Sequence, residues 1–162
     1  MRRSPKSDFG TNSLPFDMNQ YNFDFRTRFG TILRGSAWLT SPGNMGTADV
    51  YMGFVLPDGN TIAFFTEGGG FAMGSVSDLA TFQPVAANFS LAAPVSIAAP
   101  NFFIRQLNFC EPAGSYTFFL LAVKAGALLD GSLTDDEILG LSTTSFVLPD
   151  YTGYPGAPVC TH

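Results

Sequence analysis

Residues able to support catalysis are few in this 162-residue sequence. The only histidine, His162, is the last residue, and chain ends are commonly poorly ordered. Without a second histidine, Ser-His-Asp and Cys-His arrangements have no base, and neither a GxSxG nor an HExxH motif occurs. We therefore expect no catalytic residues and predict that the protein is not an enzyme.

An oxygen-rich segment suggests the one metal that this sequence could bind. Ca²⁺ prefers several carboxylate and hydroxyl oxygens, and Asp130, Asp135 and Asp136 could supply them. The spacing is not that of an EF-hand, since Gly131 comes too early and no glutamate stands at the twelfth position. The simpler interpretation is a helix cap at Thr134, with acidic residues in the first turn. No cofactor besides this possible Ca²⁺ is expected.

Aromatic side chains are abundant and could form a binding surface. Trp38, Tyr51 and Tyr116 are the candidates, because exposed Trp and Tyr rings can stack on sugar rings or contact a protein partner. Trp38 falls within an expected strand, where an inward-facing role in the core is the simpler interpretation. The 17 Phe residues have the same explanation.

Two cysteines, Cys110 and Cys160, could form one disulfide that closes a loop of about fifty residues. In the chain-entropy model such a bond stabilises the fold by roughly 4 kcal/mol. Two unpaired thiols are the equal alternative. Two cysteines are too few for a disulfide scaffold or a cysteine-rich zinc site.

Composition excludes several classes of protein. Hydrophobic residues make up 46% of the chain and charged residues only 13%, so the chain is not of the disordered class. The net charge is −5, and the later two-thirds of the chain holds only Arg105 and Lys124 as basic residues, so no nucleic-acid partner is expected. No apolar run reaches 18 residues, which excludes a spanning helix. The opening residues have the charge of a signal peptide but lack its apolar segment.

Alternation of apolar and polar residues predicts mostly β-structure. We expect strands at 21–26, 31–39, 48–56, 61–66, 85–91, 95–98, 101–109, 115–124 and 144–148. Pro57-Asp58-Gly59-Asn60 predicts a β-hairpin, because proline fixes the first corner and glycine accepts a left-handed conformation. The apolar run 115–124 is typical of a central strand covered on both faces. Gly68-Gly69-Gly70 is interpreted as a turn at a hairpin tip, followed by a long loop to Pro84.

These elements indicate one all-β domain, an antiparallel β-sandwich of the immunoglobulin-like kind with one short helix near residues 134–141. Helices of 10–15 residues, which a parallel α/β sheet needs between its strands, are not expected. The predicted organisation is an extended N-terminal arm at residues 1–19, the sandwich at 20–149 and a Pro/Gly-rich tail at 150–162.

Two motifs resemble those of β-sandwich modules in large secreted bacterial proteins. VYMGFVLPDGN is similar to a hairpin of those modules, and EPAGSYTFFLLAVKAGA with the later TSFVL is similar to their following strands. The resemblance covers about residues 49–148. It implies an immunoglobulin-like, extracellular or cell-surface, non-enzymatic domain.

The main functional hypothesis is therefore a structural or assembly module of an extracellular fibre, surface layer or adhesin. Copies of the chain, or other surface proteins, would be joined by strand exchange through the N-terminal arm. The first alternative is a carbohydrate- or protein-binding module of a secreted multidomain protein. A phage or virus surface protein is the second alternative.

Overall fold

The computed structural model describes residues 21–27, 30–107 and 110–150. They form nine β-strands and three short 3₁₀ turns, with no α-helix in this part of the chain. The strands are β1 (Tyr21–Thr27), β2 (Gly30–Ser41), β3 (Thr47–Val55), β4 (Thr61–Phe65), β5 (Phe71–Ser75), β6 (Ala86–Ser90), β7 (Val95–Leu107), β8 (Gly114–Lys124) and β9 (Ile138–Leu148). The turns are η1 (Leu79–Thr81), η2 (Ala127–Asp130) and η3 (Asp135–Glu137). The predicted arm at 1–19 and the tail from residue 151 lie outside the described residues.

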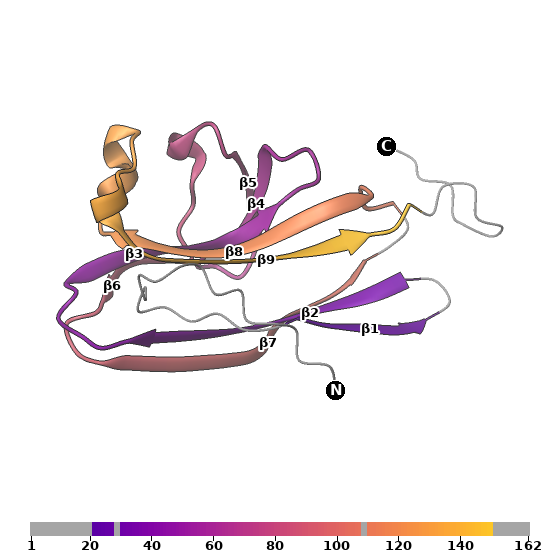
Figure 1. Cartoon of the computed structure of the whole chain (residues 1–162), viewed down its shortest axis with the longest axis horizontal. Coiled ribbons are helices and arrows are strands. Elements are labelled where there is room, and N and C mark those ends of the chain that lie inside the picture. The colour runs from indigo at the N-terminus through magenta and orange to yellow at the C-terminus, as the bar shows by residue number, and fades with distance from the viewer. Residues whose placement is uncertain (1–20, 28–29, 108–109, 151–162) are drawn as a thin grey trace.

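The strands form two antiparallel sheets packed as two layers (Figure 1). One sheet has the order β1-β2-β7, and the other has the order β5-β4-β3-β8-β9, with β6 added beside β3. The all-β, antiparallel sandwich prediction is confirmed at this level. The strand order does not establish an immunoglobulin-like topology.

The larger sheet is buried on both faces along β8, as the apolar run 115–124 predicted. Tyr116, Phe118, Leu120 and Ala122 face the smaller sheet, where Leu39, Val95, Phe102 and Phe103 pack against the same cluster. Phe119, Leu121 and Val123 alternate with them and face outward, where η2 and the segment around η1 cover them. The inward and outward sets follow from the period-2 geometry of a strand.

Gly53 in β3 is required by a close approach of β4. A Cβ atom added at this position would lie 2.4 Å from the carbonyl oxygen of Ala63. Glycine in the middle of a strand normally weakens the strand, and here the close contact between backbones explains it.

A buried carboxylate stabilises one end of β3. The register between β3 and β6 shifts between Ala48 and Val50, and Asp49 occupies this irregularity. The Asp49 carboxylate accepts hydrogen bonds from the backbone N–H groups of Asn88 (2.9 Å) and Gly126 (2.8 Å). Because Asp49 is buried, these bonds satisfy both the carboxylate and the two amides.

The hairpin predicted at residues 57–60 is confirmed between β3 and β4. Gly59 has a φ of 71°, and its N–H donates to the carbonyl oxygen of Leu56. The Asp58 carboxylate accepts from the Thr61 hydroxyl and from the N–H groups of Thr61 and Asn60, which together hold the pKa of Asp58 below its usual value. The glycine-rich turn at 68–70 is also at a hairpin tip, because the Thr66 N–H donates to the Gly70 carbonyl oxygen.

The long loop expected between Glu67 and Pro84 is wrong. β5 pairs with β4 over five residues, and η1 follows it. Because glycine and serine residues surround Phe71 and Met73, the sequence shows no clear alternation of apolar and polar residues there. The ladder to β4 and the ring contact of Phe65 with Phe71, at 4.7 Å between centroids, hold the strand.

The short helix expected near 134–141 is also wrong. The Glu137 carboxylate accepts from the Thr134 N–H at 2.8 Å, so the predicted cap exists, but it closes only the single turn η3. Ile138 is already extended and begins β9. Pairing along β8 outweighs the weak helix signal, because the segment after Ile138 contains a glycine and a run of serine and threonine, which are weak helix formers.

The two strands expected at 95–98 and 101–109 are one strand, β7. Pro100 lies within it, at a register shift opposite the interval between Gly35 and Ala37. β7 is an edge strand, and at this irregularity the missing N–H of proline removes no paired ladder bond. In the described part of the chain, no helix has the length and apolar character needed to cross a membrane.

Candidate functional site

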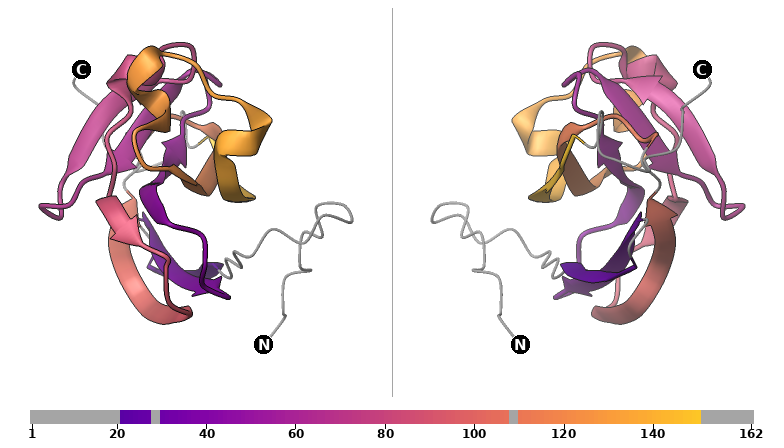
Figure 2. Two further views of the ribbon diagram at one scale, coloured as in Figure 1. Left: turned by 90° about the vertical axis from the view of Figure 1, so that its left-hand side faces the viewer. Right: turned by 90° about the vertical axis from the view of Figure 1, so that its right-hand side faces the viewer.

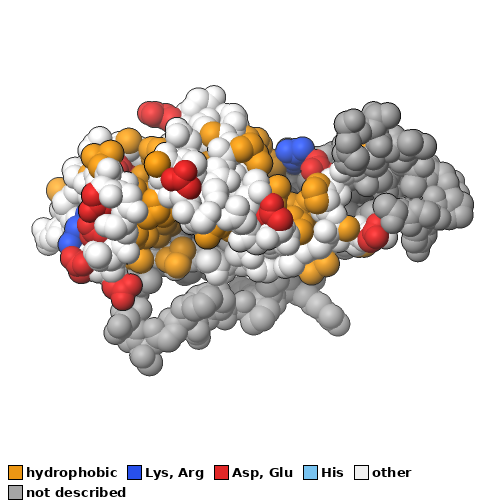
Figure 3. Space-filling view, turned by 90° about the horizontal axis from the view of Figure 1, so that it is seen from above, with side chains coloured by type: hydrophobic (Ala, Val, Ile, Leu, Met, Phe, Trp, Pro, Cys, Tyr) orange, Lys and Arg blue, Asp and Glu red, His pale blue; other side chains and the backbone are white. Residues whose placement is uncertain are grey.

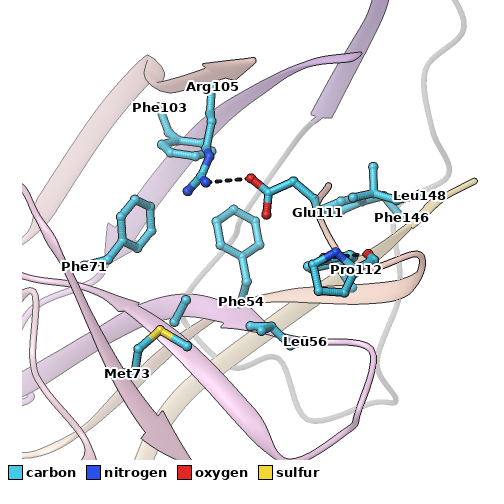
Figure 4. Close-up of a pocket in the computed structure, with 12 residues that line it drawn as sticks. Phe54, Leu56, Phe71, Met73, Phe103, Arg105, Glu111, Pro112, Phe146 and Leu148 are labelled. Atoms are coloured by element: carbon cyan, nitrogen blue, oxygen red, sulfur yellow. Dashed lines mark hydrogen bonds and ion pairs between the residues drawn. The ribbon is translucent and has the colours of Figure 1, made fainter. Parts of the chain in front are cut away.

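The candidate site is a pocket of about 250 Å³ at one end of the space between the two sheets. Its walls come from β3, β4, β5, β7, β8, β9 and the segment before β8, and Figure 4 shows how the labelled side chains surround it. Its lining residues are Phe54, Leu56, Ala63, Phe71, Met73, Phe103, Arg105, Glu111, Pro112, Tyr116, Phe146 and Leu148. Nearly all of these side chains are apolar, which suits an apolar or aromatic group.

An ion pair forms the polar part of the pocket. The Arg105 guanidinium, on β7, lies 2.6 Å from the Glu111 carboxylate, and a dashed line marks this contact in Figure 4. The Arg105 side chain is 48% exposed, so the pair is screened by solvent and contributes little to stability. Its two members come from different segments, β7 and the residues before β8.

Tyr116 connects the apolar wall to the polar rim. Its hydroxyl donates to the carbonyl oxygen of Pro112 at 2.7 Å, and its ring stacks on Phe146 at 5.1 Å between centroids. Burial, and then the negative charge of Glu111, raise the pKa of Tyr116 to about 12, while Arg105 lowers it. The ring is therefore neutral at physiological pH and acts as a hydrogen-bond donor.

Aromatic rings close the side of the pocket between β7 and the β4–β5 hairpin. Phe103 contacts Phe54 at 5.6 Å and Phe71 at 5.8 Å between ring centroids. The end-on views show these strands along one side of the two layers (Figure 2). Phe71 is 43% exposed and Met73 is 61% exposed, although both are large and apolar. Exposed apolar side chains beside a pocket are typical of an interaction surface.

The outer edge of β5 is open beside this pocket. Thr66 and Gly70 form a hydrogen-bonded pair, so alternation along the hairpin directs the backbone groups of Ala72 and Gly74 toward β4. Those of Phe71, Met73 and Ser75 point outward. The Thr81 hydroxyl accepts from the Ser75 N–H at 2.8 Å, so η1 covers this last residue. Phe71 and Met73 remain as a short unpaired edge among the described residues.

The three candidate aromatic residues do not form one surface. Tyr51 is buried on the outer face of the larger sheet and contacts Phe82 at 5.9 Å. Tyr116 is buried on the inner face and lines the pocket. Trp38 is half-buried on β2, opposite Ala98. The structure therefore brings only Tyr116 to the candidate site.

The predicted metal ligands do not converge. The Asp130 carboxylate accepts from the backbone and side chain of Ser132, and Asp136 accepts from the Thr134 hydroxyl and lies 3.5 Å from Lys124. Asp135 is exposed at the start of η3. Within the described ranges, no three His, Cys, Asp or Glu side chains are placed to hold a metal.

The disulfide prediction concerns the same end of the molecule as the pocket. Cys110 is half-buried and directly precedes the pocket residue Glu111. The structure records no free cysteine among the described residues. Cys160 lies outside them, so its pairing with Cys110 stays a prediction.

Sequence reasoning missed most of the pocket. The sequence pattern marks Arg105 only as an isolated basic residue in an alternating strand, and it predicts a loop at Phe71 and Met73. A single cation inside a strand of phenylalanines was the available signal. The pairing of Arg105 with Glu111, six residues further on, could not be found from the sequence, because Glu111 lies beyond the end of β7 and strand alternation gives no direction for its side chain.

Exposed apolar side chains also occur outside the pocket. Seen from the side of η2, η3 and the β4–β5 hairpin, apolar side chains form an interrupted band with carboxylates between them (Figure 3). Leu129 in η2 is 91% exposed and Val76 after β5 is 45% exposed. Neither lines the pocket, so both positions are suitable for control substitutions.

Comparisons with known proteins give no relative. No family model, no curated protein and no solved structure matches this chain.

Proposed function

We propose that this protein is a non-enzymatic assembly module of an extracellular or cell-surface structure, such as a fibre, surface layer or adhesin. Its partners would be copies of itself or other surface proteins, joined by addition of a strand. The edge of β5 beside the pocket, which no other described strand pairs with, is the observation that supports this proposal.

The edge has the chemistry that strand addition requires. Phe71 and Met73 direct their backbone N–H and C=O groups outward, and β5 contains no charged residue and no proline. Natural edges that avoid pairing usually carry lysine, proline or a bulge. In β-augmentation, backbone hydrogen bonds supply affinity, and a pocket for alternate side chains supplies specificity. In this protein the edge of β5 and the pocket lie next to each other.

The resemblance to immunoglobulin-like modules of secreted bacterial proteins supports the same location and class. The hairpin and the β8 strand that carry it are both present in the larger sheet. A phage or virus surface protein would use the same edge, so it is a variant of this proposal.

A binding module of a multidomain protein is the second candidate. The pocket favours it, and a lining of Phe, Met and Leu side chains favours a protein partner over a sugar. A screen of protein and glycan ligands by thermal shift would distinguish these partners.

Light scattering during size-exclusion chromatography tests the assembly proposal. We expect the full chain to form oligomers whose mass rises with concentration. Met73→Lys should reduce assembly, because a charged side chain at the open edge disfavours strand pairing. Val76→Lys adds the same charge outside the pocket and should assemble like the unmodified chain. A full chain that stays monomeric at all concentrations would contradict the proposal.

A further inference from the structure

The open edge of β5 defines what an added strand must look like. In an antiparallel pair, residues opposite Phe71 and Met73 would direct their own N–H and C=O groups toward β5. Their side chains would lie on the same side of the sheet as Phe71 and Met73, which is the pocket side. The residue between these two would direct its side chain away from the pocket and its backbone groups away from β5. It therefore needs no N–H group.

The pocket adds a requirement for one of these side chains. Its volume is about 250 Å³, and a cavity of about 150 Å³ already accepts a benzene ring. Phe54, Phe71 and Phe103 line it, and aromatic rings contact one another favourably at such distances. The matching strand is therefore apolar at alternate positions, with an aromatic residue among them.

Residues 14–18 of this chain, Leu-Pro-Phe-Asp-Met, meet both requirements. Leu14, Phe16 and Met18 alternate with Pro15 and Asp17, so three apolar side chains would share one side of a strand. Pro15 falls at a position whose N–H would point away from β5, where its absence removes no bond.

We propose that residues 14–18 of a second copy add to the edge of β5 and insert Phe16 into the pocket. This inference rests on the proposed assembly function and names the segment that performs it.

Opposite net charges favour contact between residues 1–19 of one copy and the remaining residues of another. Residues 1–19 contain Arg2, Arg3 and Lys6 against Asp8 and Asp17, a net charge of +1. The other 143 residues hold five Lys or Arg and eleven Asp or Glu, a net charge of −6. The arm of one copy is therefore attracted to the body of another, an effect that raises the rate of association and weakens with salt.

Disulfide capture between two full-length variants tests the contact directly. Phe16→Cys and Met73→Cys chains are mixed and oxidised, and cross-linked peptides are identified by mass spectrometry, which separates the 16–73 link from any exchange with Cys110 or Cys160. We expect a covalent heterodimer linked through these two positions. The matched control pairs Phe16→Cys with Leu129→Cys, a position that is exposed but does not line the pocket. No link at position 73, or equal linking at position 129, would overturn the inference.

A second pair of variants separates this inference from the assembly proposal. Phe16→Ala should weaken self-association about tenfold or more, the effect expected for a buried aromatic anchor. Phe9→Ala removes a phenyl ring from the same arm outside the alternating segment, and its self-association should be unchanged. Oligomers that persist unchanged with Phe16→Ala would overturn the inference and leave the assembly proposal standing. A monomeric unmodified chain would overturn both.

A chain carrying both Phe16→Cys and Met73→Cys tests whether the arm occupies its own domain instead. Diluted to low concentration before oxidation, it should remain without a 16–73 link if the arm belongs to a second copy. An efficient link within one chain would overturn the assignment to a second copy.

Discussion

The two ends of the space between the sheets differ in how completely they are closed. At the end near Ala48, both Ala48 and Leu91 are fully buried, and the Asp49 carboxylate joins β3 to the β6 bulge and the turn before η2. At the other end, the pocket lies behind exposed Phe71 and Met73 and a solvent-screened ion pair. The first end stabilises the fold, and the second has apolar surface left to bind a partner.

The largest expected difference in stability is between alanine variants at Leu91 and at Met73. Leu91→Ala should lower the free energy of unfolding by roughly 3 kcal/mol, because it leaves a cavity among fully buried side chains. Met73→Ala should change it by no more than about 0.5 kcal/mol, since Met73 is mostly exposed. Urea unfolding of monomeric samples measures both. Equal losses would show that the two ends are equally packed.

Removal of the Asp49 carboxylate should have the next largest effect on stability. Asp49→Ala should destabilise the protein by roughly 2 kcal/mol, because two backbone N–H groups lose their acceptor in a buried position. Asp49→Asn keeps an acceptor oxygen and should lose less. Thermal unfolding of the two variants checks this order, and a reversed order would contradict the structural role given to Asp49.

Tyr116 should make the pocket end sensitive to alkaline pH. Its pKa in the folded protein, about 12, lies above the ordinary value of 10. Its contribution to stability is therefore complete below pH 10 and is lost as the pH rises toward 12. Tyr116→Phe should lose about 1 kcal/mol at pH 7 with the bond to Pro112.

Unfolding of both proteins at several pH values from 7 to 12 tests this assignment. The stability difference between them should narrow above pH 10. A difference that stays constant to pH 12 would remove Tyr116 as the cause, whereas Tyr51, whose pKa burial and Asp49 also raise, would still titrate in both.

The smallest effect is expected from partial filling of the pocket. Ala63→Val adds two methyl carbons toward the cavity and should stabilise the monomer by about 0.5 kcal/mol. The β-branched side chain also suits a strand. Unfolding by urea measures the gain. A loss of stability would mean that the pocket is closed in solution and that valine is too large for the space that remains.

Prediction from sequence succeeded where local chemistry decides the conformation. The hairpin at Asp58 and Gly59 needs only a short turn, and its hydrogen bonds stay within residues 56–61. It failed at β5 and at the start of β9, where pairing with β4 and β8 selects a strand from sequences that have weak preferences. The candidate site was only partly predicted, since Tyr116 was named but Arg105, Glu111, Phe71 and Met73 were not.

The sequence alone determined that the chain is an all-β, two-sheet protein, because period-2 alternation and turn residues act over a few positions. It also determined that β8 is covered on both faces, because its apolar run leaves no face for solvent. Only the tertiary structure decided which strands are neighbours, where the pocket opens and that the outer edge of β5 has no partner among the described strands. Those features depend on contacts between segments far apart in the chain, such as Asp49 with Asn88 across 39 residues and Asp49 with Gly126 across 77 residues.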